Sequence, residues 1–544
     1  MGVRAGAAGL ALGARTPRKH RVTSAFAPAM NDRRWHAAIA VVLVAAIIRL
    51  AFGALLPVFP DEAYYWDWSR RLAPGYFDHP PGIAWVVRLG VMIAALFGGG
   101  VGSSPLGMRL GVAVAALVAS LATIGTARHI AGSRAALRAA LVMAVLPLSA
   151  AGLVLSTPDV PVLAAEAVAL YCVVRALDSD LRSRASLGWW TVAGVALGAA
   201  FASKYTSIFL PVGALIAIAS RSTLRARFRE PGPYVACVVA TVVFLPVLRW
   251  NADHQWISFL YQMKHGLAAP EGSALRAAWR HEGDFFGGQL GLITPILFVL
   301  CAMAVWRALK ANSDDRRLVL AVIALSTFLF FTYSAVRQRV EPNWPSPAYI
   351  PAIILVATHD WSSGGARWLV GGICLAALVS IVIYAQAITP ILPLSPPRDP
   401  IARAFGWREL ATSVVNEAEA TSAETGKTTW LGGDRYQEAA ELAFWSRGHP
   451  LTFATNIAGR PNQYDLWPGF ATVAQPGDNF VIVLDETEEP HAALRLIQPY
   501  FRSAERGLLV PMMRAGGLIG TRRIWTLVGW RGGWPPPAPS AVVR

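Results

Sequence analysis

Long apolar runs, separated by short polar loops, fill the chain from about residue 36 to residue 390. A helix needs roughly 20 apolar residues to cross the hydrocarbon of a bilayer, and several of the runs approach that length. The pattern therefore predicts a polytopic α-helical membrane protein. The runs lie at 36–56, 82–100, 106–127, 136–155, 160–177, 187–202, 206–220, 233–250, 288–309, 317–335, 346–361 and 367–388.

The run at 82–100 decides the orientation of the others. If it crossed the membrane, the arginine-rich loops after it would lie outside, against the positive-inside rule. Arg88 in its middle and three glycines at 98–100 instead favour an interfacial or re-entrant helix. We therefore expect about eleven spans, with the N-terminus in the cytoplasm, the C-terminus outside, and juxtamembrane helices between spans.

Composition divides the chain into four parts. Residues 1–35 are basic and rich in Ala and Gly, which predicts a disordered cytoplasmic tail, and residues 36–392 form the transmembrane domain. Residues 393–533 follow a Pro-rich linker and have the composition of a soluble domain, so we expect a small α/β domain on the periplasmic side. The Pro-rich composition of residues 534–544 predicts a disordered tail. The soluble part carries two strand patterns and one amphipathic helix, at 428–432, 480–484 and 434–445.

Composition also limits the partners. Charged residues make up 15% of the 544 residues, against roughly 25% in soluble proteins, and the mean hydropathy is +0.43. The net charge of +16 comes almost entirely from arginine in short loops, which suits cytoplasmic loops and phosphate contacts better than nucleic-acid binding. We expect a lipid bilayer and no nucleic acid as partner. The four cysteines lie in apolar runs and show no disulfide or metal-ligand spacing.

Five polar clusters interrupt the apolar pattern, and the eleven-span arrangement puts all of them on the external face. Loops that meet at one face can build a single site. A secondary transporter would instead place such groups near the midplane on broken helices. The clusters lie at 60–81, 157–159, 203–205, 249–265 and 337–344.

The first cluster begins with the consecutive carboxylates Asp61 and Glu62. A carboxylate beside an aromatic stretch at the membrane surface can take a proton from an acceptor hydroxyl or hold a divalent metal. Capping of a helix that starts at Pro60 is the alternative. Because Tyr76-Phe77-Asp78-His79-Pro80-Pro81 follows in the same loop, we favour the chemical interpretation.

Cations in three clusters are candidates for binding a donor phosphate. Lys204 is one of only five lysines; it can neutralise a leaving phosphate, although a lysine that snorkels to the interface is the alternative. Arg249 can bind phosphate through two parallel hydrogen bonds. Of Arg337 and Arg339, one can pair with Glu341, and the other then needs an anion.

Asp159 lies at the outer end of one apolar run, directly after Thr157-Pro158. It can orient an acceptor or a basic neighbour, or it can cap the helix that follows; both interpretations stay open. Three other residues of the polar clusters are candidates for positioning the acceptor: Tyr64, Tyr65 and Asn343.

The combination of these motifs resembles the bacterial glycosyltransferases of the aminoarabinose-transferase and protein-O-mannosyltransferase superfamily. These are membrane enzymes of the GT-C fold that use polyprenyl-phosphate sugars, and the resemblance covers about residues 36–390. Segments 432–436 and 460–465 further resemble the C-terminal domain of bacterial members, and their residues can line the acceptor side of a cleft or serve as surface and capping groups. The matching motifs are Asp61-Glu62, Phe77-Asp78-His79-Pro80-Pro81, Thr157-Pro158-Asp159, Ser203-Lys204-Tyr205 and Asn343-Trp344-Pro345.

The resemblance implies a role for four residues of the first loop. Asp61 matches the carboxylate that is thought to act as catalytic base or to position the acceptor, and Glu62 would support it. Asp78 matches an acidic position near the donor phosphate. His79 stands where aminoarabinose transferases usually carry lysine, and it can contact phosphate when it is protonated.

The resemblance also allows a divalent metal (Zn, Mg or Mn). Some relatives hold such an ion with the carboxylate at the position of Asp78 and a histidine from a later loop. His254 and His265 are both candidates for that histidine, and spacing does not choose between them.

The sequence therefore predicts an inverting glycosyltransferase at the periplasmic face of the bacterial inner membrane. It would move a sugar from a polyprenyl-phosphate donor to a hydroxyl or phosphate of an envelope acceptor: lipid A or lipopolysaccharide, another glycan, or a protein. We expect no nucleotide cofactor, because no phosphate-cradling glycine loop stands out. The alternatives are a polysaccharide ligase or polymerase with a lipid-diphosphate donor, and a lipid or solute transporter.

Overall fold

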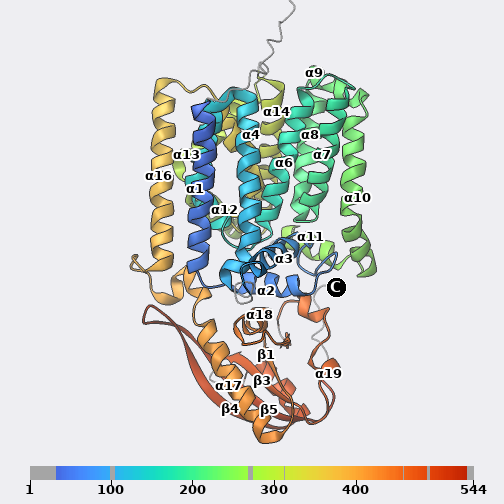
Figure 1. The fold of residues 1–544 in the computed structure, drawn as a ribbon, viewed down its shortest axis with the longest axis vertical. Helices are drawn as coiled ribbons and strands as arrows, with labels where there is room; N and C mark the ends of the chain where they lie inside the picture. Colours follow the sequence, from blue (N-terminus) through green and yellow to red (C-terminus); the bar gives the residue numbers. More distant parts are fainter. Residues whose placement is uncertain are drawn as a thin grey trace, which may run out of the picture.

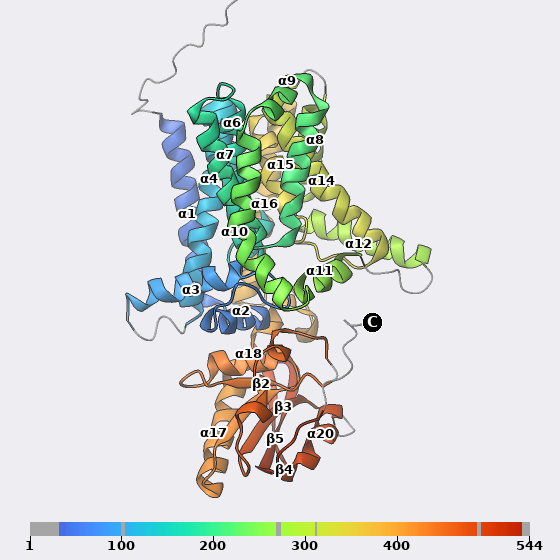
Figure 2. The same cartoon turned by 90° about the vertical axis from the view of Figure 1, so that its right-hand side faces the viewer.

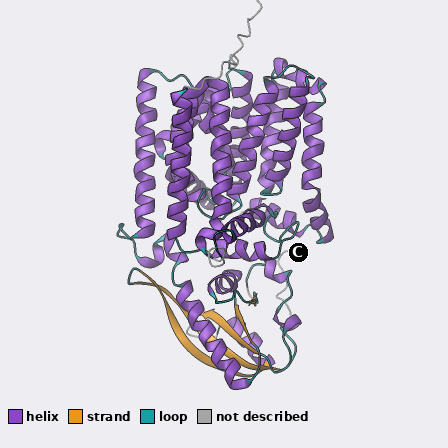
Figure 3. Cartoon of the chain, viewed as in Figure 1, coloured by secondary structure: helices purple, strands orange, loops and turns teal. Residues whose placement is uncertain are grey.

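The computed structural model describes residues 32–98, 104–267, 274–310, 313–457, 459–486 and 491–535. Helices between residues 33 and 388 form a bundle, and the following residues form a smaller α/β unit at one end of it (Figure 1). Figure 3 shows that the strands are confined to this smaller unit. Most of both expected tails, at residues 1–31 and 536–544, lies outside the described residues.

The bundle helices fall on the apolar runs that the sequence defines. The longest, α4, is broken by non-helical torsions at Ala131 and Gly132, the latter with φ +79°, which separates the two runs expected there. The helices that run along the bundle are α1 (Arg33–Leu55), α4 (Pro105–Val145), α6 (Asp159–Leu177), α7 (Arg184–Phe201), α8 (Phe209–Ser220), α10 (Gly232–Asp253), α13 (Pro295–Ala308), α14 (Asp315–Arg337), α15 (Ser346–Thr358) and α16 (Ser363–Ile388).

Six of the described helices are each long and apolar enough to cross a membrane: α1, α4, α6, α10, α14 and α16. Two further candidate spans are pairs of helices that are bent at a short break. They are Tyr205–Ser220 with Ser222–Arg229, bent by 109°, and Arg276–Ile293 with Pro295–Ala308, bent by 98°. The polytopic helical class is confirmed, whereas the count of eleven spans stays a prediction.

Several helices lie across the end of the bundle that faces the smaller unit. They are α2 (Pro60–Arg70), α3 (Gly82–Ala95), α11 (Ile257–Leu267) and α12 (Ala274–Ile293) (Figures 1 and 2). The crosswise course of α3 agrees with the interfacial placement expected for 82–100. Its large apolar side chains Trp85, Leu89 and Met92 are exposed, as suits a helix in the membrane interface.

The smaller unit, here called the C-terminal domain, is built on a five-stranded sheet of order β2-β1-β3-β5-β4. β1 (Thr429–Gly433) pairs in parallel with β2 (Thr452–Ala454) and β3 (Asn479–Asp485). β5 (Gly517–Trp530) pairs antiparallel with β3 and β4 (Phe501–Arg514). The helices are α17 (Trp407–Thr425), α18 (Tyr436–Trp445), α19 (Phe470–Val473) and α20 (Ala492–Ile497). β1, β3 and α18 match the three elements expected from the sequence.

The contact between α2 and α18 joins the two units. Ala439, Ala440 and Ala443 of α18 are fully buried in one apolar cluster with the aromatic side chains Tyr64 and Trp66 of α2. Small side chains on one helix let the large aromatic rings of the other approach closely, so the two helices pack tightly. It places the carboxyl end of β1 against the first loop of the bundle.

Glu62 and Arg109 form a buried ion pair that fixes the start of α2 to α4. Arg109 Nε donates to Glu62 Oε1 at 2.9 Å, and its Nη2 donates to Oε2. The same carboxylate accepts from the backbone N–H of Phe59 (3.1 Å) and of Ser156 (2.8 Å). A buried pair with this many hydrogen bonds orients its segment firmly, and loss of one partner costs about 3–5 kcal/mol.

The α2–α18 interface also holds a second buried carboxyl group, Glu441, which is fully buried. Its Oε2 accepts from Trp445 Nε1 at 2.9 Å, while its Oε1 has no hydrogen-bond partner among the described residues. Burial raises the pKa of Glu441 well above its usual value; the nearby Glu62 and Asp61 add to the rise, and Arg109 opposes it.

We predict that Glu441→Gln stabilises the protein at alkaline pH. The folded state binds the Glu441 proton more tightly than the unfolded state, so wild-type stability falls as pH rises above about 4.3, the usual Glu pKa. Glutamine keeps the shape of the protonated group and removes this loss. Thermal unfolding at pH 5 to 9 should show the variant increasingly more stable than wild type as pH rises.

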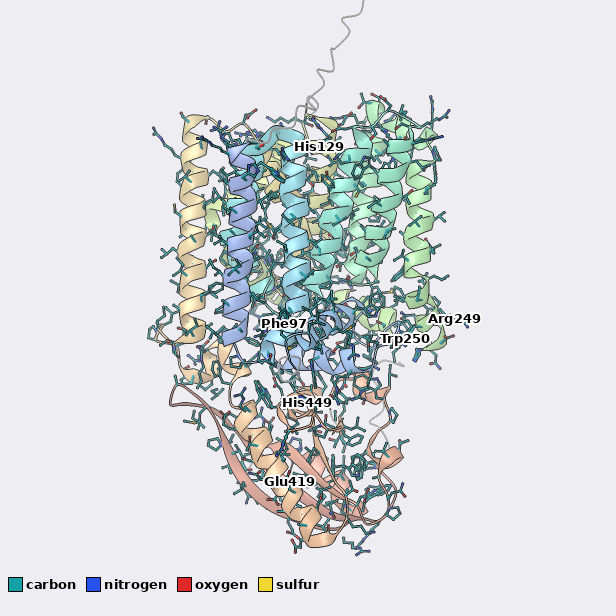
Figure 4. All side chains as sticks on the ribbon, in the orientation of Figure 1. Phe97, His129, Arg249, Trp250, Glu419 and His449 are labelled. Atoms are coloured by element: carbon teal, nitrogen blue, oxygen red, sulfur yellow. The ribbon has the colours of Figure 1, made fainter. Side chains whose placement is uncertain are left out.

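The matched control is Glu419→Gln, at an exposed position on α17 (Figure 4). It should leave the pH dependence of unfolding unchanged. A difference between Glu441→Gln and wild type that is the same at every pH would show that Glu441 is ionised in the folded protein.

Candidate active site

A cavity of ≈ 500 Å³ lies between the bundle and the C-terminal domain. Its wall combines charged and polar side chains with a separate apolar part. Among the lining residues, the polar ones include Asp61, Asp78, His79, Lys204, Gln262, Glu341 and Arg460. The apolar ones include Ile208, Phe209, Phe259, Met263, Phe330 and Phe331. The cavity therefore joins the first, third and fifth of the predicted polar clusters with parts of the fourth.

Asp61 lies in the first turn of α2, directly after Pro60, where proline and acidic residues suit a helix start. Its Oδ1 accepts a hydrogen bond from the Tyr436 hydroxyl of α18 at 3.0 Å. Burial and then the charge of Asp61 raise the pKa of Tyr436, so this phenol keeps its proton and donates it. Asp61 is half-buried at the cavity wall, which leaves it accessible to a substrate.

Asp78 is held between the two units. Its Oδ2 accepts from the Tyr64 hydroxyl at 2.7 Å, and its Oδ1 accepts from Arg460 Nη1 of the C-terminal domain at 2.6 Å. Burial raises the pKa of Asp78, and the Arg460 guanidinium opposes that rise. Arg460 Nη2 also donates to the Tyr436 hydroxyl at 3.1 Å, so one guanidinium links Asp78 to the partner of Asp61.

Lys204 lies in extended backbone shortly after α7 and lines the cavity. Its Nζ donates to Asp159 Oδ1 at 2.6 Å, and Asn343 Nδ2 donates to the other oxygen of Asp159 at 2.5 Å. Asp159 therefore orients a basic neighbour, one of the two interpretations left open. Asp159 and Asn343 do not line the cavity themselves, and they hold Lys204 at its wall.

Three other first-loop candidates take different places. Tyr64 is buried, and burial together with Asp78 raises its pKa well above the usual value, so it stays a hydrogen-bond donor. Tyr65 and His79 both line the cavity, and His79 Nδ1 lies 3.3 Å from Gln262 Nε2 of α11. Glu62 does not line the cavity, because its carboxylate is bound by Arg109. Its expected position beside the reacting groups is therefore replaced by a structural position between α2 and α4.

Three predicted phosphate ligands are not among the residues that line the cavity. Arg249, near the end of α10 (Figure 4), has 84% of its side chain exposed and lies 4.0 Å from Asp253. Arg339 is exposed and pairs with Glu341 at 3.5 Å, and Arg337 lies against Tyr333 of its own helix. The expected contact of these arginines with the donor phosphate is not supported by their positions.

Two of the three predicted metal ligands have described side chains, Asp78 and His254, and each has other partners. His254 Nδ1 lies 2.8 Å from the Trp250 carbonyl oxygen, and its ring stacks on Trp250. The His265 side chain lies outside the described residues. Both oxygens of Asp78 are engaged by Tyr64 and Arg460, and the guanidinium beside them would repel a cation. Over the described ranges, no group of three or more His, Cys, Asp or Glu residues could hold a metal ion, and a metal held by Asp78 with one histidine stays a prediction.

Sequence reasoning missed the central place of Arg460, although it grouped Arg460 and Tyr436 among residues that can line a cleft. Tyr261 and Gln262 of α11 lie in the polar cluster predicted at 249–265, but neither was given a role; they contact Arg460 and the Asp78 carbonyl oxygen respectively. For Arg460, the motif at 460–465 carried the signal. Gln463 of that motif accepts from the Phe77 N–H at 2.8 Å and so ties the C-terminal domain to the first loop.

Comparison with known proteins finds similar sequences among glycosyltransferases. The family model described as Dolichyl-phosphate-mannose-protein mannosyltransferase matches residues 78–250. Lipid A galacturonosyltransferase RgtD from Rhizobium johnstonii is 29% identical over 423 residues, which cover 77% of this chain and 84% of RgtD.

Two solved structures share the fold. The apo crystal structure of ArnT from Cupriavidus metallidurans is 18% identical with a TM-score of 0.59, and the match covers 90% of this chain and 97% of ArnT. ArnT bound to undecaprenyl phosphate is 17% identical with a TM-score of 0.60, and the match covers 91% and 98%. Together these findings identify the chain as a membrane glycosyltransferase with the GT-C fold of bacterial ArnT-like enzymes.

Proposed function

We propose that this enzyme transfers a sugar from a polyprenyl-phosphate donor to lipid A or a related envelope acceptor, with inversion at the anomeric carbon. The observation that carries the proposal is the cavity itself. It places a carboxylate (Asp61), two cations (Lys204 and Arg460) and an apolar wall around one space. The similarity to a lipid A galacturonosyltransferase and to an enzyme solved with undecaprenyl phosphate supports this choice of substrates.

The donor phosphate binds between Lys204 and Arg460. Each cation already has one carboxylate partner, Asp159 or Asp78, which fixes its position before the donor arrives. The Arg460 side chain is 45% exposed and its guanidinium carries five N–H donors. It can therefore donate hydrogen bonds to a phosphate while it keeps its ion pair with Asp78. Fixed cations at the leaving phosphate stabilise the charge that develops there in the transition state.

The polyprenyl chain lies along the apolar part of the wall. The rings of Phe209 of α8 and Phe330 of α14 pack against each other at a tilt, with ring centroids 4.5 Å apart, next to Ile208 and Phe331. An isoprenoid chain covers such aromatic surface without loss of hydrogen bonds, and the phosphate at its end then meets the cations. This arrangement suits a lipid-linked donor better than a soluble nucleotide sugar.

Asp61 acts as the base. The acceptor oxygen loses its proton to Asp61 as it bonds to the anomeric carbon, and the bond from that carbon to the phosphate oxygen breaks. The hydrogen bond from Tyr436 holds one Asp61 oxygen in place, so the other is directed to the acceptor. A single displacement of this kind inverts the anomeric configuration.

The reaction takes place on the periplasmic face of the bacterial inner membrane. The positive-inside distribution of arginine supports this side, because it favours an external position for the end of the bundle beside the C-terminal domain. A lipid A acceptor anchored in the outer leaflet would reach the cavity from the membrane, between the crosswise helices and the C-terminal domain.

We predict that Asp61→Asn lowers sugar transfer by about 10²-fold or more, because the acceptor loses its base. The assay measures label passing from a radiolabelled polyprenyl-phosphate sugar to lipid in membranes that contain the variant or wild type. Asp253→Asn, at an exposed carboxylate near the end of α10, is the control and should transfer as wild type does. Equal transfer by Asp61→Asn and wild type would rule out the catalytic role.

We predict that Lys204→Gln lowers transfer by roughly 10- to 100-fold, the loss expected for one hydrogen bond to a charged group. Arg249→Gln, which removes an exposed cation, should change it less than twofold. The same labelled donor gives both rates. If Arg249→Gln is the damaging change and Lys204→Gln is harmless, then the phosphate binds outside the cavity.

A further inference from the structure

A second concave surface lies in the C-terminal domain, with a volume of ≈ 440 Å³. Its residues come from the end of α17, the start of β3, the start of β4 and the end of β5. The carboxyl end of β1 leads into α18, which lies on the side of the C-terminal domain facing the bundle (Figure 1). This pocket instead lies where β1 and β3 begin, at the other end of these strands. It is therefore separate from the catalytic cavity.

Three exposed cations line this pocket: Lys427, Arg502 and Arg531. The lining contains no Asp or Glu, and within the described part of the chain none of the three lies within 4.0 Å of a carboxylate oxygen. Other arginines of the same domain do have such partners, namely Arg435, Arg506, Arg514, Arg522 and Arg523. The pocket thus concentrates positive charge that no carboxylate among the described residues neutralises by a direct ion pair.

The floor of the pocket is a fixed structure. Asn479 is fully buried, and its Nδ2 donates to the hydroxyls of Thr425 (2.7 Å) and Thr429 (3.2 Å). Its Oδ1 accepts from the Gly529 N–H at 3.0 Å. One amide side chain therefore ties the end of α17 to β1, β3 and β5, so the cations are mounted on a rigid edge.

Two glycines at the rim leave room for the cationic side chains. Gly529 has φ +67°, and a Cβ there would lie 2.7 Å from Arg502 Cδ. Gly477 has φ +95°, and a Cβ there would lie 3.3 Å from Lys427 Cε. The aliphatic parts of both cations thus lie against bare backbone, which directs their charged ends over the pocket rather than away from it.

We propose that this pocket binds an anionic sugar group, a phosphate or carboxylate carried by an envelope glycan, at a site distinct from the catalytic cavity. Its volume lies within the range of small-ligand sites. Backbone groups of the rim can hydrogen-bond to sugar hydroxyls, while the three cations hold the anion. Because the pocket faces away from the bundle, its ligand is a part of a glycan that extends away from the membrane.

The test measures binding of four small probes to the full-length protein in detergent by calorimetry: glucose 6-phosphate, galacturonate, inorganic phosphate and glucose. Saturable binding of either charged sugar with no binding of glucose supports the proposal. If inorganic phosphate binds as tightly as glucose 6-phosphate, the pocket recognises the phosphate group alone. If inorganic phosphate binds more weakly than glucose 6-phosphate, the sugar contributes part of the affinity. Binding of glucose equal to that of the charged sugars would overturn it.

A triple variant, Lys427→Gln, Arg502→Gln and Arg531→Gln, locates the site. We expect it to weaken binding of the charged sugars about tenfold or more while sugar transfer from a polyprenyl-phosphate donor stays unchanged. A charge-matched control replaces the exposed Arg398, Arg408 and Arg447 by Gln and should bind as wild type does. Equal losses in both triple variants, or full binding in the pocket variant, would contradict the proposal. Neither outcome depends on whether the catalytic assignment is right.

Discussion

The ion pair between Asp78 and Arg460 is the contact on which the site depends. It joins two residues 382 positions apart, one in the first loop of the bundle and one in the C-terminal domain. Through Tyr436 the same arginine is linked to Asp61, so a single guanidinium holds the proposed base and the proposed phosphate site in one arrangement. Without the C-terminal domain, the cavity would lose one cation and the group that orients Asp61.

Charges at this end of the bundle are placed in pairs before any substrate binds. Glu62 with Arg109 and Lys204 with Asp159 are both buried or nearly so. A third pair, Arg514 with Asp399, is buried where the sheet meets the end of α16. Such pairs contribute little net stability but fix orientation strongly. Preorganised charge of this kind lowers the cost of rearrangement during the reaction.

Much of this could be predicted from local pattern. Hydropathy located the bundle helices, and the expectation that Asp61, Asp78 and Lys204 share one space is met by the cavity. Similarity to glycosyltransferases also removes the transporter alternative. The polar clusters were informative because ionisable groups near a membrane are costly and are kept for a purpose.

The differences between the expected and the observed places of these residues have a common physical cause. Hydropathy shows where a loop lies but not which way its side chains point, so Arg249 and Arg339 were assigned to a phosphate although neither lines the cavity. Glu62 was assigned to chemistry because its partner Arg109 lies 47 positions away in another helix. Arg460 was undervalued for the same reason, since its importance comes from a contact with Asp78 that no local pattern contains.

The most direct test of this account is a structure of the full chain with undecaprenyl phosphate bound, determined by electron cryo-microscopy. The account predicts the phosphate within hydrogen-bond distance of Lys204 and Arg460, with the isoprenoid chain against Phe209 and Phe330. A phosphate bound instead at Arg249, Arg337 or Arg339, outside the cavity that contains Asp61, would contradict it.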